Sequence, residues 1–163
     1  MNIFGKIDKK NHMLKKQISF WVTLWLLLGI GPAIAENSPV FVAGQDDYAI
    51  RGYDPVAYHL ERKPIKGNDH YTVKWNRATW RFASRDNRDK FSKEPERWAP
   101  QYGGYCAWAV SNNYTASTDP QAWSIVDDRL YLNYSKSVRS SWSRDIPGNI
   151  RRGDANWPSV LSK

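Results

Sequence analysis

The chain has 163 residues, of which 41% are hydrophobic and 25% charged, and its formal net charge is +8. Basic residues are scattered along the sequence, which argues against a nucleic-acid-binding surface. Its single cysteine, Cys106, excludes an internal disulfide bond, so the stability of the fold must come from packing.

The N-terminus has the order of a secretory signal peptide. Five lysines lie among residues 6–16, an apolar run follows at 18–30, and Ala33 and Ala35 are the small residues before a cleavage site. The apolar run is short for a membrane span, which disfavours an uncleaved anchor. We expect cleavage after Ala35 and a periplasmic or secreted protein. Residues 36–163 then carry a formal charge of +4 and no stretch that could span a membrane.

Patterns after the predicted cleavage site indicate one domain of the α+β class, with a small antiparallel sheet and several short helices. Asp54 followed by Pro55 is typical of a helix start, because Asp caps the first turn and Pro fits its first position. Expected in chain order up to residue 100 are an edge strand at 38–43, a helix at 55–63, a hairpin of strands 70–75 and 79–82, a helix at 85–93 capped by Ser84, and a short helix at 95–98.

Residues 101–119 differ from the rest in their richness in Gly, Tyr, Ser, Asn and Thr. We expect a long ordered loop that can hold one turn of helix at 106–110, and such loops are often functional. Expected after the loop are a hairpin of strands 123–126 and 130–133, a helix at 135–144, a break at Pro147 and Gly148, and a last short helix within 150–161.

Several runs resemble the exported YHS-domain proteins: GYDPVAY, KWNRATWRFASRDNRDKFSKEPERWAPQYGGYCAWAVS, LYLNYSKSV and IPGNI. The resemblance covers residues 52–161 and divides the chain into a signal peptide (1–35), an N-terminal extension (36–51) and a YHS-like domain (52–163). It implies a YHS/TRASH-like frame, a small α+β unit that is generally described as a metal-binding module. Such domains occur beside copper-transporting ATPases and in some hydroxylases.

One departure from the family pattern concerns the metal ligands. In the metal-type YHS domains, the resemblance implies cysteines at the positions of Ala57 and Ala83 and near Asn87. This chain has no thiol at any of them, and a tetrahedral metal site needs several soft or imidazole ligands. The family's ligand set therefore cannot be transferred to this protein.

Three interpretations of Cys106 remain open from the sequence. It can be a buried, packed thiol, a reactive thiol, or a ligand of copper or another soft metal ion. In the branch resembled here, the GGYCA cysteine can be replaced by selenocysteine, which implies that the sulfur takes part in chemistry. His59 and His70 are the candidate further metal ligands, although nothing in the sequence places them beside Cys106. The candidate ligand-pocket residues around Cys106 are Tyr102, Gly103, Gly104, Tyr105 and Trp108.

These observations favour an exported, non-enzymatic YHS-domain protein that binds a soft metal or a small ligand at a site including Cys106. A metal-handling protein would then be its partner. The alternative is a thiol redox protein or sensor in which Cys106 is the catalytic residue, and which needs an external thiol because the chain has no resolving cysteine. The third interpretation is a structural or protein-interaction module in which Cys106 only packs.

Overall fold

The computed structural model describes residues 37–43 and 48–163, which belong to one compact unit, Glu36–Lys163. The predicted signal peptide and residues 36 and 44–47 lie outside the described residues. Among the helices in the described part, none combines the length and the apolar character that crossing a membrane would require.

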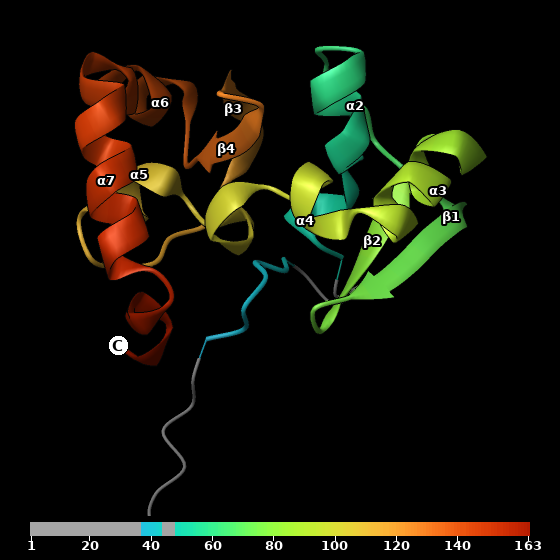
Figure 1. Cartoon of the computed structure of the whole chain (residues 1–163), viewed down its shortest axis with the longest axis horizontal. Helices are drawn as coiled ribbons and strands as arrows, with labels where there is room; N and C mark the ends of the chain where they lie inside the picture. The colour runs from blue at the N-terminus through green and yellow to red at the C-terminus, as the bar shows by residue number, and fades with distance from the viewer. Residues whose placement is uncertain (1–36, 44–47) are drawn as a thin grey trace, which may run out of the picture. The chain divides into compact units, whose positions relative to one another are not determined.

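Short helices and two antiparallel hairpins make up the described unit, which confirms the predicted α+β class (Figure 1). The strands form two separate two-stranded sheets, β1 with β2 and β3 with β4. In chain order the elements are η1 (Ile50–Gly52), α2 (Pro55–Leu60), β1 (Asn68–Trp75), β2 (Ala78–Phe82), α3 (Arg85–Lys93), α4 (Pro95–Trp98), η2 (Gln101–Gly104), α5 (Ala107–Ser111), β3 (Asp119–Val126), β4 (Arg129–Asn133), α6 (Lys136–Trp142), η3 (Ser143–Asp145), α7 (Ile146–Asn156) and η4 (Ser159–Ser162).

Most predicted elements are present, although several bounds differ: β3 begins at Asp119, four residues before its predicted start, and the one predicted sheet is divided into two. Segment 38–43 contributes a single bridge, between Val42 and Ala49, in place of an edge strand. The first long helix ends at Leu60, three residues before the predicted end. The predicted break at Pro147 and Gly148 is wrong, because α7 begins at Ile146 and has Pro147 in its first turn. A proline there removes no helical hydrogen bond, since the first N–H groups of a helix have no partner within it.

Both hairpins turn through two residues with positive φ. These are Asn76 and Arg77 between β1 and β2, and Asp127 and Asp128 between β3 and β4. Two consecutive left-handed residues match the right-handed twist of the flanking strands, and Asn and Asp tolerate that conformation better than most residues. The Asp-Asp pair therefore has a conformational role in the second hairpin.

Strand β4 is shared between two hydrophobic clusters. Its Leu130 and Leu132 belong to the first cluster, with the rings of β1, β2 and α3, whereas Tyr131 between them belongs to the second, with Tyr102 and Trp142. Side chains alternate across a strand, so one strand serves both clusters. Figure 1 shows the corresponding halves of the unit, with β1, β2 and α2–α4 in one and β3, β4 and α5–α7 in the other.

The carboxylate of Asp54 joins three segments of the first half. Oδ1 accepts the N–H groups of Val56 and Ala57 at 2.8 and 3.3 Å, which caps α2. Oδ2 accepts the N–H of Ala83, after β2, at 2.9 Å and the side-chain amide of Asn87, in α3, at 2.7 Å. Asp54 is fully buried, and this burial raises the pKa of its carboxyl, whereas the four hydrogen bonds oppose the shift. One side chain thus fixes how α2, β2 and α3 meet.

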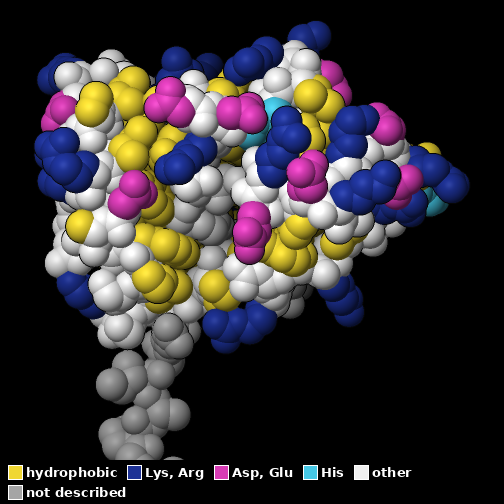
Figure 2. Space-filling view, in the orientation of Figure 1, with side chains coloured by type: hydrophobic (Ala, Val, Ile, Leu, Met, Phe, Trp, Pro, Cys, Tyr) yellow, Lys and Arg dark blue, Asp and Glu magenta, His cyan; other side chains and the backbone are white. Residues whose placement is uncertain are grey.

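Charged side chains cover the surface without a single-sign patch on the visible face. Figure 2 shows Lys and Arg side chains spread over that face, with Asp and Glu side chains between them. Several form ion pairs with close neighbours in the sequence, such as Lys90 with Asp86 and Arg97 with Glu94. Mixed charge of this kind favours solubility and produces no strong local field.

Replacing Asp54 by alanine is expected to lower the free energy of unfolding by about 2–4 kcal/mol, because four donors lose their acceptor and those inside the protein stay unpaired. Urea unfolding followed by tryptophan fluorescence measures this change.

Asp86→Ala is the matched control, since Asp86 lies in the first turn of α3, is exposed, and pairs only with Lys90 in the described part of the chain. Its expected cost is below about 0.5 kcal/mol. Equal stabilities of the two variants would contradict the organising role of Asp54.

Candidate functional site

Cys106 immediately precedes α5, and its side chain is only 1% exposed. The backbone N–H of Tyr134 donates to Sγ at 3.3 Å, and the thiol donates to Asn133 Oδ1 at a sulfur–oxygen distance of 3.8 Å. Asn133 Oδ1 also accepts the N–H of Trp108 at 3.1 Å. Two adjacent residues at the end of β4 therefore give the sulfur one donor and one acceptor, which is the environment of a neutral thiol.

Burial raises the pKa of the Cys106 thiol above its usual range, and N–H groups of Ala109, Tyr134 and Trp108 oppose this shift only in part. The helix that follows Cys106 has five residues, so its dipole is short. Thiolate is the form that attacks electrophiles and binds metals, and it is disfavoured here. The environment of Cys106 thus favours a packed thiol over a reactive one.

The two candidate histidines lie in different surroundings from Cys106. His59, in α2, is buried against the ring of Trp98, and its Nδ1 lies 3.6 Å from Asp128 Oδ1, beyond hydrogen-bonding distance. Burial lowers the pKa of His59, and the nearby Asp128 carboxylate offsets part of this effect. His70 is exposed on β1. Within residues 37–43 and 48–163, no three His, Cys, Asp or Glu side chains are grouped so as to hold a metal ion.

The positions at which the family resemblance implies metal-binding cysteines come together in this structure. Ala57 and Ala83 donate their backbone N–H groups to the Asp54 carboxylate, and Asn87 donates its side-chain amide. The three positions therefore surround one buried acidic group. In this chain, the three positions carry no thiol and donate hydrogen bonds to Asp54.

The glycines before Cys106 allow the chain to approach itself closely. Gly103 and Gly104 have φ values of 60° and 82°. A Cβ on Gly103 would lie 1.9 Å from the carbonyl oxygen of Pro39, and one on Gly104 would lie 2.7 Å from Ile50 Cγ2. The sequence suggested that these glycines leave room for a ligand, whereas Pro39 fills the space at Gly103 and Ile50 fills it at Gly104.

The aromatic residues of this loop are divided between the core and a cleft. Tyr105 is buried and donates its hydroxyl to Ser38 O at 2.8 Å, and Trp108 is half-buried in the second cluster. Tyr102 donates its hydroxyl to Asp154 Oδ1 at 2.9 Å, and together with Gly103 it lines a cleft of about 310 Å³. Of the five predicted pocket residues, Tyr102 and Gly103 thus reach this cleft.

Tryptophans from distant segments supply the other aromatic walls of the cleft. Trp75 from β1, Trp80 from β2 and Trp157 after α7 line it, and Glu96 from α4 lies at its border. Trp157 lies 6.0 Å from Tyr102, and Trp75 lies 5.8 Å from Trp80, between ring centroids. Two aromatic pairs from different parts of the chain therefore meet at one opening. Trp80 is at the same time fully buried in the first hydrophobic cluster, and Trp75 packs against that cluster. The sequence did not single out Glu96 or Trp157.

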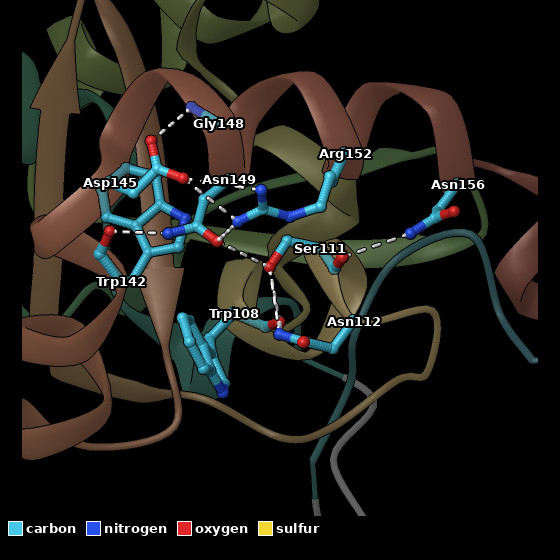
Figure 3. Close-up of polar contacts among 9 residues, drawn as sticks. All are labelled: Trp108, Ser111, Asn112, Trp142, Asp145, Gly148, Asn149, Arg152 and Asn156. Carbon is cyan, nitrogen blue, oxygen red and sulfur yellow. Dashed lines mark hydrogen bonds and ion pairs between the residues drawn. The ribbon is translucent and has the colours of Figure 1, made fainter.

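A polar network fixes the helix that carries Trp157. Figure 3 shows Ser111 and Asn149 facing each other between α5 and α7, where Ser111 Oγ donates to Asn149 Oδ1 at 3.2 Å. Asn149 in turn donates to Trp142 O at 2.8 Å and accepts from Arg152 at 2.6 Å. Farther along α7, Asn156 donates to Val110 O at 2.8 Å. These bonds hold α7 against α5 and thereby position the C-terminal wall of the cleft.

Close packing also positions Tyr102 on α7. A Cβ on Gly153 would lie 2.5 Å from the hydroxyl oxygen of Tyr102, so only glycine leaves room for this ring. The Tyr102 hydroxyl then reaches Asp154, the next residue of α7. Tyr102 is thus clamped at one end while its ring contributes to the cleft.

Native Cys106 is expected to react with 5,5′-dithiobis(2-nitrobenzoate) at least about 100-fold more slowly than an exposed thiol at neutral pH, because it is buried and its raised pKa keeps it protonated. Absorbance of the released thiolate measures the rate.

Ser137→Cys in a Cys106→Ser background provides the exposed reference thiol, since Ser137 is exposed in α6. Unfolding in guanidinium should bring the two rates together. A native Cys106 rate equal to that of the reference would instead identify a reactive thiol.

Comparisons with models of known protein families, with curated proteins and with solved structures find no match to this chain. The function proposed below therefore rests on the geometry of the cleft and of Cys106.

Proposed function

We propose that this protein is an exported binding module without catalytic activity, and that it binds a small ligand in the aromatic cleft. The main observation behind the proposal is that the half-buried rings of Trp75 and Trp157, backed by the buried rings of Trp80 and Tyr102, line one opening of about 310 Å³. Small-ligand sites have volumes from roughly 300 Å³ upward and are lined mainly by apolar and aromatic side chains with a few polar groups. The cleft lies at the small end of this range, and polar and apolar groups contribute about equally to its lining.

Cys106 has a supporting role in this proposal. Its sulfur joins the end of β4 to the start of α5 through Asn133 and Tyr134. The segment just before it, η2, contributes Tyr102 and Gly103 to the cleft. The thiol thus helps to hold the loop that forms one wall, and it is itself absent from the residues that line the cleft.

The soft-metal and redox interpretations of Cys106 both need an accessible sulfur that ionises readily. A side chain that is 1% exposed, together with a raised thiol pKa, supports the packing role more than either of them. A conformational opening that exposed Cys106 would be required for metal binding or for redox exchange with an external thiol.

Export and membership of a YHS-like family remain parts of the proposal with support of their own. The basic and apolar N-terminal segment that ends at Ala35 supports export to the periplasm or the medium. The convergence of Ala57, Ala83 and Asn87 on Asp54 supports the YHS-like frame, because these positions lie apart in the sequence. A YHS-like frame without thiols at these positions suits a binding module that holds no metal there.

Filling the cleft is expected to abolish ligand binding. Gln101→Trp places a large side chain at a half-buried position that lines the cleft, so fragments bound by the wild-type chain should be lost. Ligand-observed NMR with a library of cationic, anionic and neutral fragments measures binding.

Gln121→Trp is the matched control, because Gln121 is exposed on β3 and does not line the cleft. Its fragment binding should equal that of the wild type. The proposal fails if no fragment binds, or if both variants lose binding to the same extent.

Titration with copper(I) and with zinc separates the two roles of Cys106. Wild type and Cys106→Ser are expected to bind both ions equally weakly, since the thiol is buried and protonated. Competition with a chromophoric chelator measures the affinities. A tenfold or larger loss of copper(I) affinity in Cys106→Ser would restore the soft-metal interpretation.

A further inference from the structure

We infer that the cleft selects a small organic cation, such as a quaternary ammonium compound, over a neutral compound of the same shape. This inference rests on the proposed function, in that it names the chemical class of the ligand. Three features support the inference: the carboxylate of Glu96 at the border of the cleft, the hydrogen bonds made by its aromatic side chains, and the positions of the nearby basic side chains.

Glu96 is the one charged residue among the thirteen described residues that line the cleft. No ion pair of Glu96 occurs in the described part of the chain, although its neighbours are paired. Arg97 lies 3.5 Å from Glu94 and 4.0 Å from Asp128, and its guanidinium lies 4.7 Å from the ring centroid of Trp98. The adjacent arginine is therefore engaged away from the cleft, and Glu96 is free to attract a positively charged ligand.

The aromatic walls favour a cation as well. The faces of aromatic rings carry negative potential and their edges positive potential, and Trp and Tyr attract ammonium groups most strongly. The indole N–H of Trp80 donates to Trp75 O at 3.1 Å, and the hydroxyl of Tyr102 donates to Asp154. The positive ends of these two side chains are thus bound within the protein, which removes them as donors to an anionic ligand.

Basic residues near Trp75 lie outside the cleft. Lys74 and Arg77 line a different hollow, which shares Trp75 and Asn76 with the cleft. Lys74 and Trp75 are adjacent on β1, and consecutive side chains of a strand point to opposite faces. An anion in the cleft would therefore meet the carboxylate of Glu96 without a basic residue of the lining, whereas a cation would meet Glu96 and the half-buried rings of Trp75 and Trp157.

Choline and 3,3-dimethyl-1-butanol test this inference. The two compounds have the same shape, but the alcohol has a neutral carbon where choline has its charged nitrogen. Each is titrated into the full chain, and binding is followed through the indole N–H signals of Trp75 and Trp157. We expect choline to bind at least about tenfold more tightly than the neutral alcohol. Glu96→Gln should weaken choline binding about three- to tenfold and leave the alcohol unaffected.

Asp86→Asn is the matched control, since Asp86 is exposed, pairs with Lys90 and does not line the cleft, so this change leaves the partners of Arg97 in place. Its choline affinity should equal that of the wild type. Equal binding of the two probes would overturn the cation inference and leave the small-ligand proposal intact. The cation inference would also fail if neither probe bound while other fragments bound to the wild type and were lost in Gln101→Trp. Cleft signals that shift with protein concentration would also overturn it, by showing that a second copy of the chain fills the cleft.

Discussion

The first half of this protein depends on one buried carboxylate. Asp54 accepts hydrogen bonds from the start of α2, from the residue after β2 and from α3, and Asn87 of α3 also donates to Glu61 Oε1 at 3.3 Å. Burying a charge is costly unless hydrogen bonds compensate it, so the surrounding backbone must keep its donors in place. The same requirement fixes the β1–β2 hairpin, and through Trp75 and Trp80 it fixes one side of the cleft.

Local signals predicted much of the fold. Asp54 and Pro55 correctly predicted the start of α2, and Ser84 correctly predicted the cap of α3, because capping depends on residues adjacent in the sequence. The start of α7 was missed because Pro147 was interpreted as a breaker, although proline also fits the first turn of a helix. The division into two sheets was not predicted, since pairing between hairpins depends on tertiary contacts that no local pattern encodes.

The candidate site was harder to predict than the fold. Glycines and tyrosines around Cys106 directed attention to one loop, and Tyr102 and Gly103 of that loop do line the cleft. Trp75, Glu96 and Trp157 come from other segments, and each by itself resembles an ordinary core or surface residue. Only the packing of α7 on α5 and of η2 on Pro39 and Ile50 brings these residues to one opening. A site assembled in this way has no sequence motif.

The two ends of the described chain meet at the cleft. Asn37 donates its N–H to Leu161 O at 2.8 Å, and both Pro39 and Leu161 line the opening. A ribosome makes the first of these residues long before the last, so this wall cannot close while the chain is still being synthesised. Closure of this wall therefore has to wait until Leu161 has been synthesised, and a chain truncated just before Leu161 would lack this wall even if the rest of its core had formed.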